Sequence, residues 1–180
     1  MDNSELVSSI QEGDETAFRK MVETYQQMVL NIARRFVETQ EEAQDITQEV
    51  FIEIFRSIKT FRSNSSLSTW IYRITITRSL NHVRKEKRHK GKMWENDPVT
   101  NDTPDKLLED DDRKRILDSA ISTLPENQRI AFVLHNYEDL SYNDIASVMN
   151  RSVSSVESLI FRARKNLQKK LWDWYKKSRI

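Results

Sequence analysis

The chain contains no cysteine and only two glycines and three prolines among its 180 residues. The lack of cysteine excludes disulfide bonds and thiolate metal sites. Tight hairpins rely on glycine, asparagine and proline at their turns, so this scarcity favours helices over sheets. No apolar run approaches the roughly 20 residues of a membrane-spanning helix, and residues 1–15 are acidic, unlike a signal peptide. We therefore expect a cytoplasmic, all-α protein.

The net charge of +1 conceals four blocks of alternating sign. Residues 1–55 carry 4 basic and 12 acidic side chains, whereas residues 56–92 carry 11 basic and 1 acidic. Residues 93–149 carry 5 basic and 13 acidic side chains, and residues 150–180 carry 9 basic and 2 acidic. Solvated helix faces would explain a short run. A net charge of +10 within residues 56–92 is costly by self-repulsion. The two basic zones therefore favour two anionic contacts, or one long one.

Hydrophobic periodicity predicts a series of helices in the first half of the chain. Apolar residues recur at three- and four-residue steps over residues 14–37. Thr39 and Glu42 form a capping box that opens a second helix. The inward residues of that helix are Ala43, Ile46, Val50, Ile54 and Ile58. Residues 59–68 are expected to form a loop, and Ser68 is expected to cap a third helix from Thr69 to about Lys90.

A polar stretch then predicts a break in the fold. Gly91, two prolines and an acidic run at residues 110–112 indicate a flexible linker over residues 93–112. Further helices follow: Pro125 stands where one begins, Ser141 caps a short helix that ends at Met149, and the last runs from residues 152–154 to about Trp172. We expect two small helical domains, at residues 1–92 and 113–180, joined by this linker.

The helix expected at residues 69–90 has one apolar side and one polar side. The apolar side carries Tyr72, Ile76, Leu80 and Val83. The polar side carries Arg73, Thr77, Asn81, Arg84 and Arg88. Arginine offers phosphates a charged planar fork, and asparagine can pair with an adenine edge, so this helix suits nucleic acid. Trp70, beside the polar loop, either stacks on an unpaired base or anchors the core.

Residues 141–167 fit a helix-turn-helix whose turn is residues 150–152. The expected core stripe of its second helix is Val153, Val156, Ile160, Ala163 and Leu167, packed on Ile145, Ala146 and Met149. The opposite side carries Ser154, Ser158, Phe161 and Lys165, flanked by Arg162 and followed by Lys169 and Lys170. An aromatic ring among serines requires a partner. That partner is a thymine methyl group in a major groove or, alternatively, another protein surface.

Segments of this sequence, taken in order, resemble the extracytoplasmic-function group of bacterial sigma factors. They are DITQEVF at residues 45–51, FRSNSSLSTWIYRI at residues 61–74, LPENQR at residues 124–129, LSYNDIA at residues 140–146 and VESLIFRAR at residues 156–164. The resemblance covers roughly residues 10–172. It departs from the family at Thr77, where asparagine is usual, and at Glu157 and Leu159, where basic residues are frequent.

The resemblance implies a role for each part. Residues 1–92 correspond to sigma region two, in which Asp45, Gln48 and Glu49 would contact RNA polymerase core. Residues that would melt and read the promoter −10 element are Arg62, Asn64, Trp70, Arg73, Asn81, Arg84 and Arg88. Residues 113–180 correspond to region four. Residues that would read the −35 element are Ser154, Ser155, Glu157, Ser158, Phe161, Arg162 and Lys165. Glu157 either accepts a hydrogen bond from a cytosine amino group or caps the last helix through Ser154.

The implied partners are polymerase core, promoter DNA and an anti-sigma factor, with no cofactor and no small-molecule substrate. An enzyme is one rival, because Glu86 and His89 match half of a helical di-iron motif. That motif needs two copies, and His82 and His135 have no visible triad partners, so we expect neither catalysis nor a metal. The alternative is a helix-turn-helix regulator that binds duplex DNA without polymerase. The first domain, with its basic helix and Trp70, argues for single-strand capture instead.

Overall fold

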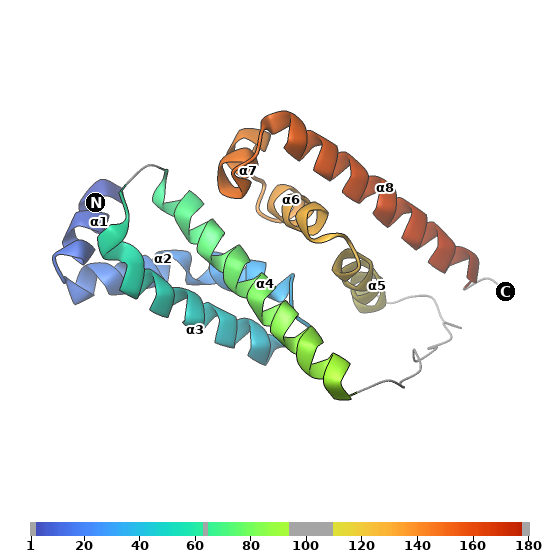
Figure 1. The fold of residues 1–180 in the computed structure, drawn as a ribbon, viewed down its shortest axis with the longest axis horizontal. Helices are drawn as coiled ribbons and strands as arrows, with labels where there is room; N and C mark the ends of the chain where they lie inside the picture. The colour runs from blue at the N-terminus through green and yellow to red at the C-terminus, as the bar shows by residue number, and fades with distance from the viewer. Residues whose placement is uncertain (1–2, 63–64, 94–109, 178–180) are drawn as a thin grey trace. The chain divides into compact units, whose positions relative to one another are not determined.

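The computed structural model describes residues 3–62, 65–93 and 110–177, and Figure 1 traces them as a ribbon. Within these ranges the chain forms eight α-helices and one short 3₁₀ helix and has no strand, which confirms the all-α fold. None of the described helices is long and apolar enough to cross a membrane. The chain divides into two compact units, one built mainly on the first four helices and the other mainly on the last four.

The first unit contains α1 (Asn3–Gln11), α2 (Glu15–Arg34), α3 (Gln40–Ser57), the 3₁₀ helix η1 (Ile58–Thr60) and α4 (Leu67–Met93). Asp14 caps α2, so the helix expected over residues 14–37 is present but ends at Arg34. The capping box of α3 is confirmed. The Thr39 hydroxyl accepts from the Glu42 amide at 3.2 Å, and the Glu42 carboxylate accepts from the Thr39 amide at 3.0 Å.

Helix α1 was not predicted from the sequence. This helix ends at Gln11, and the chain then turns at Gly13, whose φ of 96° suits glycine and whose amide donates to the Ile10 carbonyl at 3.0 Å. Leu6, Val7 and Ile10 are buried, and the Gln11 amide donates to the carbonyls of Ile58 at 2.9 Å and Phe61 at 3.1 Å. Three apolar residues in nine are a weak periodic signal. These residues pack on α2, which follows directly, and on η1, far along the chain. A signal this weak did not identify the helix by local spacing.

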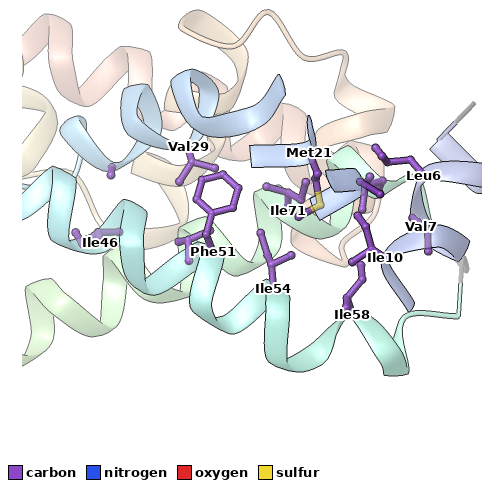
Figure 2. Close-up of a cluster of buried hydrophobic side chains, with 14 of the residues drawn as sticks. Leu6, Val7, Ile10, Met21, Val29, Ile46, Phe51, Ile54, Ile58 and Ile71 are labelled. Atoms are coloured by element: carbon purple, nitrogen blue, oxygen red, sulfur yellow. The ribbon is translucent and has the colours of Figure 1, made fainter. Parts of the chain in front are cut away.

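The core of the first unit lies where α1, α2, α3 and α4 meet (Figure 2). Met21 and Val29 of α2 are fully buried against Ile46, Val50 and Ile54 of α3. Ile71 brings the first turns of α4 into the same cluster (Figure 2). The inward stripe expected for the helix after Thr39 is confirmed, because Ala43, Ile46, Val50, Ile54 and Ile58 are all buried.

Helix α4 differs from expectation in its cap and its buried side. The helix begins at Leu67, and the Ser66 hydroxyl accepts from the Thr69 amide at 3.1 Å, so Ser66 caps it in place of Ser68. Its most buried residues are Leu67, Ile71, Tyr72, Thr75, Ile76 and Ser79, whereas Leu80 and Val83 are half-buried. The buried face thus includes three small hydroxyl residues, Thr69, Thr75 and Ser79, which hydrophobic periodicity counts as polar.

The second unit contains α5 (Asp110–Ser122), α6 (Glu126–Asn136), α7 (Tyr142–Met149) and α8 (Val153–Lys177). Most of the expected linker, residues 94–109, lies outside the described residues. Helix α5 begins at Asp110, inside the stretch expected to be linker. Helix α8 packs on α6 and α5 through a stripe of Val156, Ile160, Ala163 and Leu167, all buried. Val153, the fifth expected member, is exposed because it lies at the first position of the helix.

Candidate nucleic-acid interfaces

The outer side of α3 is acidic with an apolar end. Asp45, Gln48 and Glu49 are all exposed on it. Two neighbours that were not predicted from the sequence, Ile52 and Phe55, are 50% and 60% exposed. The Phe55 ring meets Phe18 edge-on with centroids 5.1 Å apart. Both residues fall off the inward stripe of α3 on a helical wheel, and that signal could have identified them. The acidic residues disfavour DNA here, so this face suits a protein partner.

Two polar contacts join α4 to α3. The Arg78 guanidinium donates to Glu53 Oε2 at 2.5 Å, and His82 Nε2 lies 3.4 Å from Glu42 Oε1. Partial burial of the Glu42 carboxyl acts to raise its pKa. Hydrogen bonds from the Thr39 amide and hydroxyl, His82 and the Glu38 amide outweigh it, so the pKa of Glu42 is lowered. Glu42 therefore caps α3 and contacts α4 as a stable anion.

The opposite side of α4 presents the basic residues expected there. Thr77, Asn81, Arg84 and Arg88 are exposed, and Arg73 is half-buried. The Arg88 guanidinium donates to the Arg84 carbonyl at 3.3 Å, one turn earlier, which holds two arginines on one face. Arg62 is exposed just ahead of α4, and Asn64 lies outside the described residues. The structure thus places five of the seven predicted −10 residues, Trp70, Arg73, Asn81, Arg84 and Arg88, on one helix.

Trp70 stands at the start of α4, and its ring centroid lies 4.9 Å from that of Phe61, with the planes tilted by 39°. It packs against the core of the first unit but stays half-exposed. This packing agrees with the core-anchor interpretation of Trp70. The exposed part of the ring leaves base stacking as a prediction.

The outer side of α8 carries the residues expected for duplex readout. Ser154, Glu157, Ser158, Phe161, Arg162 and Lys165 are exposed, and Ser155 is half-buried. Five of them, Glu157, Ser158, Phe161, Arg162 and Lys165, line one open depression along the helix. The Phe161 side chain is 69% exposed, although it is a large apolar group. The face thus combines an apolar ring with cationic and hydroxyl groups, as base-edge contact in a major groove requires.

Local sequence fixes the turn that orients α8. Asn150 adopts φ 51°, and the Arg151 amide donates to the Ala146 carbonyl at 3.0 Å, which closes the end of α7. The Ser152 hydroxyl accepts from the Ser155 amide at 3.3 Å and caps α8. This cap is Ser152, so the capping role considered for Ser154 and Glu157 is not needed. Ser141 caps α7 as expected, accepting from the Asp144 amide at 3.2 Å.

Elsewhere in the second unit, an electrostatic interaction between Asp118 and Arg129 links α5 and α6. Burial lowers the pKa of the Arg129 guanidinium on α6, and the nearby Asp118 carboxylate on α5 opposes that shift. Arg129 belongs to the LPENQR segment and lies inside the unit, so its role is to position helices. Among the described residues, no group of three or more histidine, aspartate or glutamate side chains could hold a metal.

Each of the two units matches a region of a known protein family. Residues 21–89 match sigma-70 region 2, and residues 114–167 match sigma-70 region 4. The RNA polymerase sigma-H factor of Pseudomonas aeruginosa is 37% identical, over 94% of this chain and 93% of its own length. The ECF RNA polymerase sigma-E factor of Haemophilus influenzae is 35% identical, over 92% and 93%.

Among solved structures, the sigma factor RpoE of Bartonella quintana, in complex with the anti-sigma factor NepR, has the same fold. Its TM-score is 0.66 at 20% identity, over 86% of this chain and 96% of that one. The two region matches lie in the same order as the two units, and the similarity to curated relatives spans nearly the whole chain. The chain therefore belongs to the ECF group of the sigma-70 family, non-enzymatic initiation factors that associate with RNA polymerase at specific promoters.

Proposed function

We propose that the two basic faces described above divide promoter recognition between them. The outer face of α4, with Arg62, Asn64 and Trp70, engages the −10 element as it opens. The outer face of α8 reads the −35 element in duplex form. Residues 1–92 and 113–180 act as the two domains, and residues 93–112 connect them. The protein acts in the cytoplasm, where polymerase and promoter DNA are found.

The observation that carries this proposal is Phe161. Its ring is 69% exposed, lies opposite the buried stripe of α8, and is flanked by Arg162 and Lys165. An exposed aromatic ring inside a cationic depression makes no stabilising apolar contact while it faces water. It gains apolar contact against a thymine methyl group, while the neighbouring arginine can pair with guanine. Glu157, in the same depression, supplies an acceptor for a cytosine amino group.

The outer face of α3 is proposed to contact polymerase core. Asp45 and Glu49 would repel phosphates, so this face suits a protein surface. Ile52 and Phe55 add the apolar contact that usually contributes most to a protein interface. Core binding would also bring the two DNA-reading faces to one promoter. Once one face has bound the promoter, the second face binds intramolecularly, at a high effective concentration.

We also propose that an anti-sigma factor regulates the chain. The support is that a solved protein of the same fold was crystallised with such a partner. An anti-sigma factor that covers the outer face of α3 would exclude polymerase core from it. In a competition assay, core polymerase should displace such a partner from the full chain. Simultaneous binding of both would contradict this mode of regulation.

Run-off transcription with core polymerase and a library of promoters tests the −35 assignment. Phe161→Ala and Arg162→Ala should each weaken −35 recognition by about 1–3 kcal/mol. Lys170→Gln is the matched control, because Lys170 is exposed on the opposite side of α8. Unchanged promoter use by both alanine variants would refute the −35 role of this face.

The α3 assignment is tested by charge reversal. Asp45→Arg with Glu49→Arg should abolish retention of core polymerase by the tagged full chain. Glu23→Arg is a suitable control, because Glu23 is an exposed carboxylate on a different helix, α2. Retention of core polymerase by the double variant at the level of the control would refute the contact.

A further inference from the structure

Helix α8 continues well past the region 4 match, which ends at residue 167. We call residues 168–177 the α8 tail; their sequence is QKKLWDWYKK. Trp172 and Tyr175 of this tail are 56% and 41% exposed. Large exposed aromatic groups on a helix end indicate a surface that meets a partner.

The exposed side of the α8 tail lies in line with the face that carries Phe161. At 3.6 residues per turn, Trp172 returns to within about 20° of Phe161 around the helix axis, and Lys176 to within about 60°. Lys169 lies about 80° from Phe161, whereas Lys170 lies about 180° away. The reading face of α8 therefore extends without a break into the tail.

The tail presents a flat, cationic surface. The rings of Trp172 and Tyr175 stack with centroids 5.9 Å apart and planes inclined by 23°. The Lys176 ammonium lies 5.3 Å from the centre of the Trp172 ring. Residues 168–177 contain four lysines and a single acidic residue, Asp173. This charge is complementary to phosphate.

The length of α8 decides which part of a DNA duplex the tail would meet. A helix rises about 1.5 Å per residue, so Trp172 lies about 16 Å beyond Phe161 along the axis. A major groove is about 12 Å wide, and recognition helices contact bases with their N-terminal residues. With Phe161 among the base edges, the tail passes the rim of the groove, where sugars and phosphates lie.

We propose that the α8 tail is a second DNA contact, which holds the sugar–phosphate backbone beside the −35 element. Lys169 and Lys176 neutralise phosphates, and the Trp172 ring packs on a deoxyribose. The position of this contact rests on the proposed −35 role of α8. Backbone contacts carry no sequence information, so the tail adds affinity and fixes the position of the helix, while Phe161 and its neighbours set the preference.

The test measures DNA binding by the full chain at a series of salt concentrations. Fluorescence anisotropy of a labelled duplex reports the binding. Lys169→Gln with Lys176→Gln should lower the slope of log K against log salt by about 2, and affinity by about tenfold at moderate salt. Trp172→Ala should weaken binding about threefold with an unchanged slope, because it removes no charge. Lys170→Gln is the matched control from the same turn of the helix.

Two duplexes are compared, the promoter recovered from the library and one of arbitrary sequence. Phosphate contacts do not depend on sequence, so a backbone contact should act equally on both. Equal losses on both duplexes for the tail variants would support the proposal. A slope for the double lysine variant equal to that of Lys170→Gln would overturn it. Normal DNA binding combined with loss of core polymerase in a pull-down would also overturn it, since the tail would then contact a protein.

Phe161→Ala, measured in parallel, separates this proposal from the −35 assignment. It should change the ranking of promoter sequences and leave the salt slope unchanged. If that ranking is unaffected, the −35 assignment fails. The proposed contact of the α8 tail is still tested, because its readout is the slope of log K against log salt for the duplex of arbitrary sequence.

Discussion

Helices α4 and α8 both present a cationic outer face, but different chemistry holds them in their units. The buried side of α8 is an apolar stripe of Val156, Ile160, Ala163 and Leu167. The buried side of α4 also has four apolar residues, Leu67, Ile71, Tyr72 and Ile76, but it adds the hydroxyl groups of Thr75 and Ser79. Contacts of α4 with α3 include the Arg78–Glu53 and His82–Glu42 pairs. Apolar burial is worth about 1.5–3 kcal/mol per large side chain, whereas a partly exposed ion pair contributes about 0–1 kcal/mol.

This difference matches the two DNA states that the faces are proposed to meet. A duplex −35 element has a fixed shape, so a reader held by apolar packing needs no adjustment. The −10 element changes from duplex to open strands during initiation. A helix held partly by small hydroxyl groups and ion pairs can shift while the strand is captured. The comparison therefore predicts that α8 reads DNA by itself and that α4 depends on polymerase.

The largest expected effect concerns strand opening by the free chain. Each base-pair step costs about 1.4 kcal/mol to unstack, so opening five steps costs about 7 kcal/mol. The outer face of α4 alone does not supply that energy. Permanganate should modify thymines of the −10 element only when core polymerase accompanies the chain. Modification by the chain without polymerase would break the contrast between the two helices.

The next largest effect concerns the packing of α8. Ile160 is 1% exposed. Ile160→Ala should therefore lower the free energy of unfolding by about 2–5 kcal/mol. Its neighbour Phe161 is exposed, so Phe161→Ala should change stability by at most about 0.5 kcal/mol. Urea denaturation of the full chain, followed by circular dichroism, measures both. Similar losses for the two variants would show that the outer ring supports the fold.

These helices also show what local sequence can predict. The Thr39–Glu42 capping box and the turn at Asn150 follow from residues within a few positions of each other, and both were found. Phe161 was found because a single ring departs from a clean apolar stripe. Helix α1 was missed because three apolar residues in nine give a weak periodic signal, and the cap of α4 was misplaced between two nearby serines, Ser66 and Ser68. The two serines flank Leu67, the first residue of α4, so spacing alone could not separate them.

A smaller effect should appear at Glu42, which connects α3 and α4. Its pKa is lowered in the folded chain, so its contribution to stability is present above the ordinary glutamate pKa. The contribution is lost as pH falls through the lowered pKa. Glu42→Gln should cost up to about 1 kcal/mol at neutral pH and nothing at acid pH. Urea denaturation at several pH values tests this. A cost that grows as pH falls would contradict the sign.

The smallest effect concerns Ser79, on the buried side of α4. Its side chain is fully buried, and its hydroxyl has no hydrogen-bond partner among the described residues, whereas the Thr75 hydroxyl donates to the Ile71 carbonyl at 2.8 Å. Burying an unpaired hydroxyl is unfavourable, and alanine is the better helix former.

Ser79→Ala should therefore raise the free energy of unfolding by about 0.5–1 kcal/mol. Thr75→Ala, one turn earlier, should lower it, because it removes a bonded hydroxyl and a buried methyl group. Urea denaturation of both variants, compared with run-off transcription, extends the comparison to function. If adjustability of α4 serves strand capture, the stabilised Ser79→Ala chain should start transcription more slowly. An equal rate would show that the polar buried side of α4 has no role in initiation.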